Sequence, residues 1–241
     1  MADPTAVIFD YYETLARLPD AVREPLFDDV ARRAGADLAA GEAYRHWRER
    51  TANDRAVRFG GQRPPLDGAA PPFVTFRETW LQRFEQLFRL WGVDAPPALG
   101  ADACRDAHAE AGPYPDAVEA LESLRGSHRL AVLSDADRDF LSASVERSGL
   151  AFEAVVASED VEAYKPHVSM FREGCARLGV EPAQAVYVGD SPWADIAGAR
   201  NAGLRAVWMN RHGAEWPQDI EPPELAITTL EELPALLAQV P

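Results

Sequence analysis

Four side chains that could do chemistry together stand at or near the ends of short apolar runs. Asp10 directly follows the run at 6–9, Ser134 follows another such run, and Asp190 comes shortly after a third. Lys165 lies in a loop-like stretch between two further elements. Runs this short and apolar are typical of strands buried on both faces of a parallel sheet, and open α/β sheets bind ligands at the carboxyl edge of such strands. We therefore expect these four side chains to meet at one edge.

The combination of two carboxylates, a hydroxyl and an ammonium indicates group transfer to an aspartate. Asp10 and Asp190, if brought close together, would repel each other, and one would stay protonated unless a cation lay between them. Mg²⁺ suits such a place because it takes oxygen ligands, few of them from protein, and keeps waters and substrate phosphate. Lys165 could offset the remaining negative charge, and Ser134 with nearby backbone N–H groups could hold phosphoryl oxygens. An aspartate nucleophile with these helpers implies an acyl-phosphate or ester intermediate.

The elements that must position these side chains alternate between strand and helix from residue 113 onward. The predicted strands are 6–9, 130–133, 154–156, 185–188, 205–208 and a weak one near Ala226, and the predicted helices are 115–124, 138–147, 168–178, 194–201 and 230–239. This alternation is typical of an α/β fold with a doubly wound parallel sheet. After the strand at 185–188, we expect Gly189 to allow a tight turn and Pro192 to begin the next helix.

The segment from 16 to 112 has a different, helical texture. Helices are predicted over 21–34, 42–59, 73–91 and 97–111, with an irregular loop at 60–72 that is dense in Gly and Pro. No strand is expected between 16 and 112. The sequence therefore predicts an α/β core formed by residues 1–15 and 113–241, with a helical cap inserted at 16–112. The 60–72 loop is either a substrate-specificity loop or only a long connection.

The composition excludes several classes of partner. The chain has a formal net charge of −15, which argues against nucleic acid and disfavours anionic membranes. No apolar run approaches the length of a membrane span and no signal peptide fits the first residues. The two cysteines, Cys104 and Cys175, are far apart and are expected to be buried free thiols, which suits a cytoplasmic location. We expect a small, anionic substrate and either a monomer or a homodimer.

Four motifs in this order give the chain a family resemblance. They are FDYYETL at 9–15, LSD at 133–135, YKP at 164–166, and VGDS at 188–191 with Asp195 beyond it. The sequence resembles the haloacid dehalogenase superfamily of hydrolases, in the branch with a helical cap. The resemblance covers the predicted core, and the cap matches only in position and helical character.

The resemblance implies a role for each matching residue. It makes Asp10 the nucleophile and a Mg²⁺ ligand, Asp190 a second ligand, and the backbone carbonyl of Tyr12 a third. Ser134 would hydrogen-bond the transferring group, and Lys165 would bridge that group to Asp10. Further residues are expected beside these: Asp135 and Arg17 near an anionic substrate, with His46 and Arg48 as other candidates, and Thr14, Ser191 and Asp195 in support of the ligands.

Tyr12 departs from the phosphatase pattern. Phosphatases of the superfamily usually carry Asp two residues after the nucleophile as general acid and base, and a tyrosine with a pKa of about 10 is a poor base near neutrality. Tyrosine at this place resembles the 2-haloacid dehalogenases, in which halide leaves without protonation. Those enzymes are metal-free and usually lack the Gly-Asp pair, whereas Gly189 and Asp190 have the phosphatase form.

We give the last motif more weight than the first. A metal would use the carbonyl of residue 12, so the Tyr12 side chain leaves a Mg²⁺ site intact, and an uncompensated Asp190 would hinder an ionised Asp10. The sequence therefore favours a Mg²⁺-dependent phosphatase of a small phosphorylated metabolite that works through an aspartyl-phosphate on Asp10. The alternatives are a 2-haloacid dehalogenase that works through an aspartyl ester, and a protein that binds a ligand without turnover.

Some side chains keep two interpretations. Glu13 or Asp135 could partly replace the missing acid and base, and Tyr12 could either take part in the chemistry or only pack against the cap. His108 and His128 have no partner that the sequence indicates, and we expect both at the surface.

Overall fold

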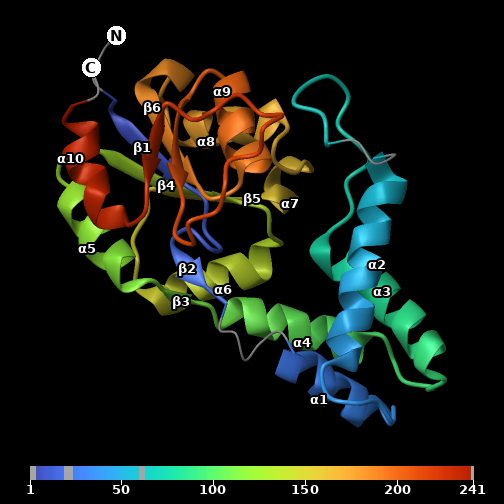
Figure 1. The fold of residues 1–241 in the computed structure, drawn as a ribbon. Helices are drawn as coiled ribbons and strands as arrows, with labels where there is room; N and C mark the ends of the chain where they lie inside the picture. The colour runs from blue at the N-terminus through green and yellow to red at the C-terminus, as the bar shows by residue number, and fades with distance from the viewer. Residues whose placement is uncertain (1–3, 19–23, 60–62, 240–241) are drawn as a thin grey trace.

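The structure is a computed structural model that describes residues 4–18, 24–59 and 63–239, with only the backbone described at 52–59. It contains a parallel sheet with helices on both faces and a group of helices beyond one edge of that layer (Figure 1). None of the helices in the described part of the chain combines the length and the apolarity that spanning a membrane requires.

Six parallel strands form the main sheet in the order β5-β4-β1-β6-β7-β8. Their bounds are β1 Ala6–Phe9, β4 Arg129–Ser134, β5 Ala154–Ala157, β6 Ala185–Gly189, β7 Arg205–Met209 and β8 Leu225–Ile227. Strand β1 lies in the middle and is fully buried, as an uninterrupted apolar strand of a two-sided parallel sheet should be. The predicted doubly wound parallel sheet is confirmed.

The register of the central strands places Asp10, Ser134 and Asp190 at the same edge of the sheet. Phe9 pairs with Val132 on one side and with Val188 on the other. Asp10 therefore stands one step beyond β1, while β4 ends with Ser134 and β6 ends at Gly189, directly before Asp190. The parallel pairing alone carries these groups to the same edge.

Helices cover both faces of the sheet. The longer ones are α5 Pro115–Leu124, α6 Arg138–Ser148 and α8 Val168–Leu178, and the shorter ones are α7 Ser158–Val161, α9 Gly198–Asn201 and α10 Leu233–Leu237, with a π-helical turn at Pro192–Ala197 and 3₁₀ turns at Pro182–Gln184 and Leu230–Glu232. Val7 and Phe9 of β1 face the cluster that contains α5, α6 and α10, and Ile8 faces the cluster that contains α8 and α9. The predicted last helix is thus split, and the predicted helix at 194–201 begins two residues earlier, with Pro192 in its first turn as expected.

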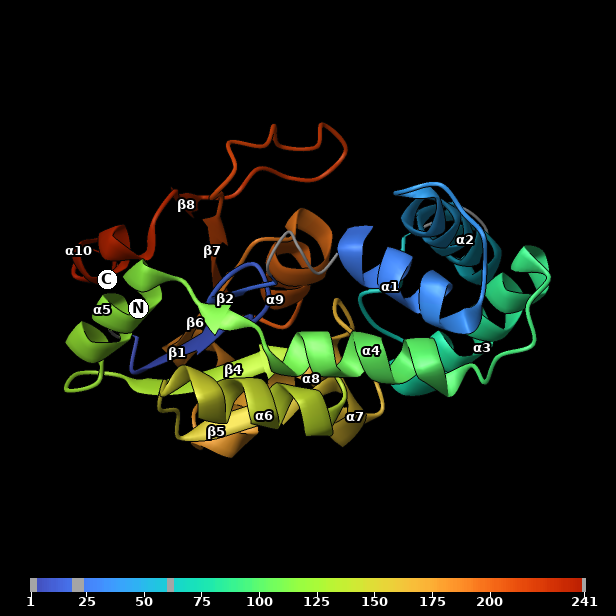
Figure 2. The same ribbon diagram turned by 90° about the horizontal axis from the view of Figure 1, so that it is seen from below.

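We refer to residues 16–112 as the cap segment. Its helices are α1 Glu24–Ala34, α2 Glu42–Phe59, α3 Phe76–Trp91 and α4 Ala98–Ala109. Helix α3 begins with a capping box between Thr75 and Glu78 and ends at Gly92 in the left-handed conformation. Helix α4 lies beside α6 of the core (Figure 2). Buried residues of α1, α3 and α4 belong to the same hydrophobic cluster as one face of the sheet, so the cap segment and that face share one core.

A short ribbon at the base of the cap segment contradicts the expectation of no strand between 16 and 112. Strand β2, Ala16–Arg17, pairs antiparallel with β3, Gly112–Pro113, where the chain leaves and re-enters the core. The Tyr114 N–H extends this pairing by donating to the Leu15 carbonyl at 2.9 Å. Two-residue strands have no periodic pattern in the sequence, because what forms them is the meeting of two distant segments.

The predicted irregular loop is tied to the core at its described end. Residues 63–75 form no helix or strand, and 60–62 lie outside the described residues. The Leu66 carbonyl accepts from the Val168 N–H at 2.8 Å, and the Pro64 carbonyl accepts from Trp193 Nε1 at 3.0 Å. Trp193 lies in the turn that follows Asp190, so this loop contacts the turn that carries one of the chemical residues.

The contact of α3 with α4 depends on a missing side chain. A Cβ on Gly100 would lie 2.3 Å from the ring of Phe84, which is fully buried. We expect Gly100→Ala to lower the free energy of unfolding by about 1–3 kcal/mol through overpacking. Gly126→Ala is the matched control, because nothing lies within 4 Å of a Cβ there. Urea denaturation measures both, and equal stabilities of the two variants would contradict this description of the interface.

Candidate active site

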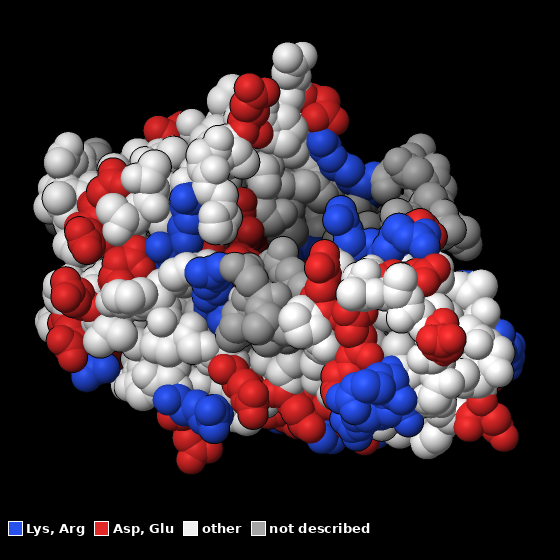
Figure 3. Space-filling view, turned by 60° about the horizontal axis from the view of Figure 1, so that its bottom comes forward, with Lys and Arg blue, Asp and Glu red and all other residues white. Residues whose placement is uncertain are grey.

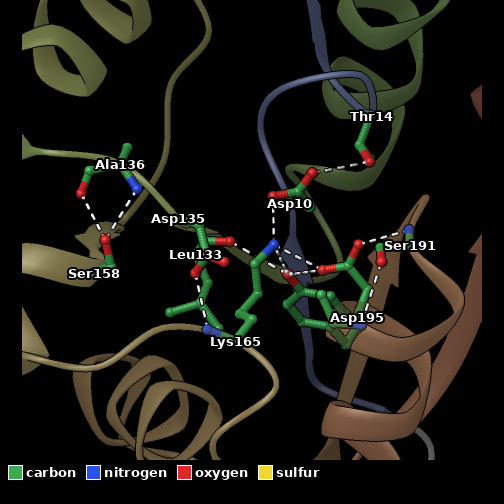
Figure 4. A network of polar contacts seen from close by, with 11 residues as sticks. Asp10, Thr14, Leu133, Asp135, Ala136, Ser158, Lys165, Ser191 and Asp195 are labelled. Carbon is green, nitrogen blue, oxygen red and sulfur yellow. Dashed lines mark hydrogen bonds and ion pairs between the residues drawn. The ribbon is translucent and has the colours of Figure 1, made fainter. Parts of the chain in front are cut away.

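A single buried ammonium, that of Lys165, makes the central contacts of the candidate site. Lys165 Nζ donates to Asp10 Oδ1 at 2.6 Å, to Asp195 Oδ1 at 2.7 Å and to the Tyr187 hydroxyl at 3.1 Å (Figure 4). All four residues are buried. An ammonium has three hydrogens, and here each has an acceptor. The Lys165 head group is therefore fixed in place by the fold.

Neighbouring turns hold Asp10 and Lys165 against each other. The Asp10 N–H donates to the Val188 carbonyl at 2.9 Å, which continues the pairing of β1 with β6, and Thr14 Oγ1 donates to Asp10 Oδ2 at 3.3 Å. The backbone N–H of Lys165 donates to Asp135 Oδ1 at 2.9 Å, so Asp135 ties the lysine loop to the end of β4. Thr14 and Asp135 thus contact the carboxylate and the lysine loop, respectively.

The turn after β6 presents Asp195 to the lysine. Asp195 Oδ2 accepts from the Ser191 N–H at 2.8 Å, and Oδ1 accepts from Lys165 and from the Tyr187 hydroxyl at 3.0 Å. A Cβ on Gly189 would lie 2.5 Å from Cγ of Asp195. Gly189 has no positive φ, and what the structure requires of it is the space that this carboxylate occupies.

Three carboxylates gather around the one ammonium. Asp10, Asp190 and Asp195 each offer an oxygen, and these oxygens lie within 4.8 Å of one another. Burial, with the neighbouring carboxylates, raises the pKa of Asp190 and of Asp10, although Lys165 opposes the shift. Burial lowers the pKa of Lys165, but Asp10 and Asp195 outweigh it and hold that pKa well above its ordinary value. The site is thus poor in positive charge.

Tyr12 faces the cap segment. Its hydroxyl donates to the His108 carbonyl at 3.3 Å, and its ring contacts the rings of His108 and Phe140. Burial raises the pKa of Tyr12, and the charge of Asp10 adds to the shift, so the phenol stays protonated near neutrality. The expectation that His108 lies at the surface is wrong, because it sits among aromatic rings in the cap segment, whereas His128 is partly exposed and makes an exposed hydrogen bond with Ser127.

Other predicted site residues lie at different distances from this centre. Ser134 is buried at the end of β4, and Arg17 is exposed on β2 at the base of the cap segment. His46 accepts from Trp91 Nε1 at 3.1 Å within the cap segment. Glu13 has a φ of 65°, and its carboxylate accepts from the Tyr114 hydroxyl at 3.3 Å, beside the ribbon. Glu13 and Asp135 are therefore both engaged with other groups.

Sequence reasoning missed Tyr187. This residue occupies a strand position in AVYVG, where any large apolar side chain would suit the pattern. The sequence does mark the partner of Tyr187, which is Lys165. It is the only lysine in the chain, and all other basic side chains are arginine or histidine. Arginine has a planar fork and cannot replace a compact three-donor ammonium at this spot.

The comparisons with known proteins agree with this geometry. A family model described as haloacid dehalogenase-like hydrolase matches residues 4–203. The chain is 32% identical over 141 residues to (S)-2-haloacid dehalogenase 4A of Burkholderia cepacia, covering 57% of this chain and 61% of that protein. It is 31% identical over 167 residues to the pyrimidine 5′-nucleotidase YjjG of Escherichia coli K12, covering 67% of this chain and 74% of that protein.

A solved structure has the same fold over nearly the whole chain. The YfnB protein of Bacillus subtilis, whose structure contains bound magnesium, has a TM-score of 0.77 at 22% identity, covering 98% of this chain and 99% of that one. At this identity the likeness shows the fold alone. The relatives include both dehalogenases and phosphatases, so the reaction has to be argued from the site.

Lys165 is testable through stability as well as activity. In Lys165→Met, two buried carboxylates lose their counter-ion, and we expect a loss of about 3–5 kcal/mol of unfolding free energy near neutral pH. The loss should shrink as the pH falls, because the raised pKa of Asp10 means that this group protonates readily in the folded state. The measurement is urea denaturation in EDTA near neutral pH and near pH 4, as approximate settings for the ionised and protonated carboxylate.

The matched control is Arg177→Met. Arg177 forms an exposed pair with Glu173 at 2.7 Å, and such pairs contribute about 0–1 kcal/mol. If Lys165→Met were no more destabilising than this control near neutral pH, the ammonium would not be the group that holds the site together.

Proposed function

Because the chain belongs to the haloacid dehalogenase-like hydrolase family, we propose that it is a Mg²⁺-dependent phosphatase of a small phosphorylated metabolite. In this proposal Asp10 attacks the phosphorus and carries the phosphoryl group as an aspartyl-phosphate. The single observation that carries the proposal is the charge balance at the site. Three carboxylates lie together, and among the described residues the one ammonium beside them, that of Lys165, is paired with only Asp10 and Asp195.

The donor set fits Mg²⁺. Carboxylate oxygens are the ligands that this ion prefers in proteins, and it usually takes only one or two of them. Asp195 accepts three hydrogen bonds, from Lys165, Tyr187 and the Ser191 N–H, and serves in this proposal to position the lysine, while Asp10 and Asp190 are the residues that would hold the ion. The backbone carbonyl of Tyr12 is the third proposed ligand. When bound, Mg²⁺ would neutralise charge on the phosphoryl oxygens as they approach Asp10.

The residues of the chain supply the rest of the reaction. Lys165 orients Asp10 and stabilises negative charge on the transferring group, with Ser134 as a further hydrogen-bond donor. A bond forms between Asp10 and phosphorus while the bond from phosphorus to the leaving oxygen breaks, and that oxygen departs with the electron pair. Water then attacks the same phosphorus, the Asp10–phosphorus bond breaks, and dihydrogen phosphate is released, which passes one proton to the oxyanion of the leaving group.

An anionic substrate suits the surface despite the net charge of −15. Figure 3 shows basic side chains on both sides of a hollow in the face of the molecule that it presents, with acidic side chains also at the rim of that hollow. Local positive charge of this kind offsets a repulsive overall field and attracts a phosphorylated ligand.

A specific observation favours hydrolytic dehalogenation as the second candidate. The Tyr12 hydroxyl stays protonated and donates a hydrogen bond to a backbone carbonyl, so it offers no acid or base to a leaving group. Halide leaves without protonation, and Lys165 could by itself keep Asp10 ionised for attack on carbon. The relatives that are haloacid dehalogenases point the same way.

One assay separates the two candidates. Purified protein is offered phosphomonoesters and 2-haloacids, each with Mg²⁺ and with EDTA, and phosphate and halide are measured. The proposal predicts phosphate release that requires Mg²⁺ and falls by at least about 10³-fold in Asp10→Asn, as expected when the nucleophile is lost. Halide release in EDTA, without phosphate release under any condition, would establish the second candidate instead.

Metal binding should be coupled to proton release. Burial and the neighbouring carboxylates raise the pKa of Asp190 to about 8, so this group is largely protonated near neutrality before a cation arrives. Mg²⁺ must displace that proton, and its affinity should therefore rise as the pH rises toward 8. Calorimetry in buffers of different ionisation enthalpy measures the protons released.

Two substitutions provide the test and the control for this measurement. Asp190→Asn should abolish both Mg²⁺ binding and proton release, whereas Asp94→Asn, at an exposed carboxylate of the cap segment, should change neither. Binding that is equally tight at all pH values would show that Asp190 is not a ligand.

A further inference from the structure

A closed circuit of aromatic contacts begins and ends at the Asp10–Lys165 pair. Tyr12, two residues after Asp10, contacts Phe140, with ring centroids 6.2 Å apart. Phe140 contacts Phe76 at 6.1 Å, and Phe76 contacts Tyr164 at 5.5 Å. Tyr164 directly precedes Lys165, which donates to Asp10. Tyr12 and Tyr164, the chain neighbours of Asp10 and Lys165, therefore link this pair to a row of aromatic contacts on the side of the cap segment.

The polar atoms of this circuit are bound to backbone carbonyls. The Tyr12 hydroxyl donates to the His108 carbonyl, and the Tyr164 hydroxyl donates to the Val74 carbonyl at 2.7 Å. His108, which contacts both Tyr12 and Phe140, lies with Nδ1 2.7 Å from the Cys104 carbonyl and so carries its proton there. The rings consequently present faces and edges without acidic protons, and within the described part of the chain no hydrogen bond is made to Nε2 of His108, which is an acceptor in this tautomer.

The circuit keeps part of its surface open. Phe140, a member of the circuit, is 2% exposed, and Trp80, which contacts it, is 3% exposed, whereas Tyr12, Phe76 and Tyr164 are only partly buried. The partly exposed members are the ones nearest in the chain to Asp10, to Lys165 and to the start of α3.

We propose that this circuit, which we call the aromatic subsite, binds the leaving group of the substrate, and that the substrate is the phosphomonoester of a phenol. This inference rests on the proposed phosphatase function and names its substrate class. An aryl ring gains from edge and face contacts with the surrounding rings. Nε2 of His108 accepts a hydrogen bond from an N–H or O–H carried by that ring.

The chemistry of such a substrate matches the absence of an acid at Tyr12. As the bond from Asp10 to phosphorus forms, the bond from phosphorus to the aryl oxygen breaks, and the oxygen departs with the electron pair as a phenolate. A phenolate is stable enough to leave unprotonated, because the pKa of a phenol is about 10. An aliphatic alkoxide would need a proton at that moment, and the aromatic subsite has no group that supplies one.

Binding of two inert ligands tests the aromatic subsite apart from turnover. Phenylphosphonate and cyclohexylphosphonate have the same head group and similar size, and they differ in the aromatic character of the ring. With Mg²⁺ present, calorimetry should find phenylphosphonate bound about tenfold more tightly, the scale of aromatic pair contacts. Equal affinities would overturn the proposal.

A matched pair of variants locates the preference. Phe76→Leu should reduce it to about twofold or less, as expected if aromatic pair contacts produce it. Phe152→Leu, the same change at a partly buried phenylalanine between α6 and β5, should preserve it. If Phe76→Leu fails to fold, His108→Leu provides the same comparison. A preference that survives both subsite variants would overturn the assignment of these rings.

A leaving-group series separates this inference from the proposed function. Turnover of substituted phenyl phosphates should fall steeply as the pKa of the phenol rises, and Tyr12→Asp should flatten that dependence by supplying an acid. Turnover with no aromatic preference and a flat series would refute the aromatic subsite and leave the phosphatase standing. No phosphate release from any ester, with the preference for phenylphosphonate intact, would refute the phosphatase and leave the subsite standing.

Discussion

The structure depends on one constraint, which is the placement of a single ammonium among carboxylates that would otherwise repel one another. Lys165 contacts two aspartates and a tyrosine hydroxyl, and each contact comes from a different part of the chain. Asp10 is delivered by β1, Tyr187 by β6, and Asp195 by the π-helical turn. Gly189 is required because a side chain there would occupy the space of the Asp195 carboxylate. A buried ion cluster of this kind costs stability unless every partner is in place, so the fold must be accurate at this edge.

The cap segment adds a second constraint on the same space. Its buried residues continue the hydrophobic cluster of one sheet face, and its start and end are joined by the β2–β3 ribbon. Because the loop at 63–75 also bonds to the core near Trp193 and Val168, the cap segment contacts the core on several sides. Enclosure of this kind excludes water and strengthens electrostatic interactions between the aspartates and the lysine. If the aromatic subsite binds as proposed, its rings select which leaving groups can approach Asp10.

Much of the core could be predicted from sequence because its signals are local. Short apolar runs that end in Asp10, Ser134 and Gly189–Asp190 define buried parallel strands, and parallel pairing places their ends together. The features that escaped prediction depend on contacts between distant segments. In the sequence, Tyr187 cannot be distinguished from any other large strand residue, because its hydroxyl contacts appear only in the fold. His108 contacts Tyr12, which is 96 positions away in the chain.

The proposed Mg²⁺ ligands Asp10 and Asp190 share the site with Tyr12, whose hydroxyl is bound to a backbone carbonyl, and these two features are opposed only if the leaving group needs an acid. The account holds that Asp10 itself becomes phosphorylated, and the direct measurement is to quench the enzyme during turnover of an aryl phosphate with Mg²⁺ and to map modified peptides by mass spectrometry. The account predicts a phosphoryl group on Asp10 in the wild type and none anywhere in Asp10→Asn. A phosphoryl group on another residue, or an ester on Asp10 formed only from a 2-haloacid, would contradict it.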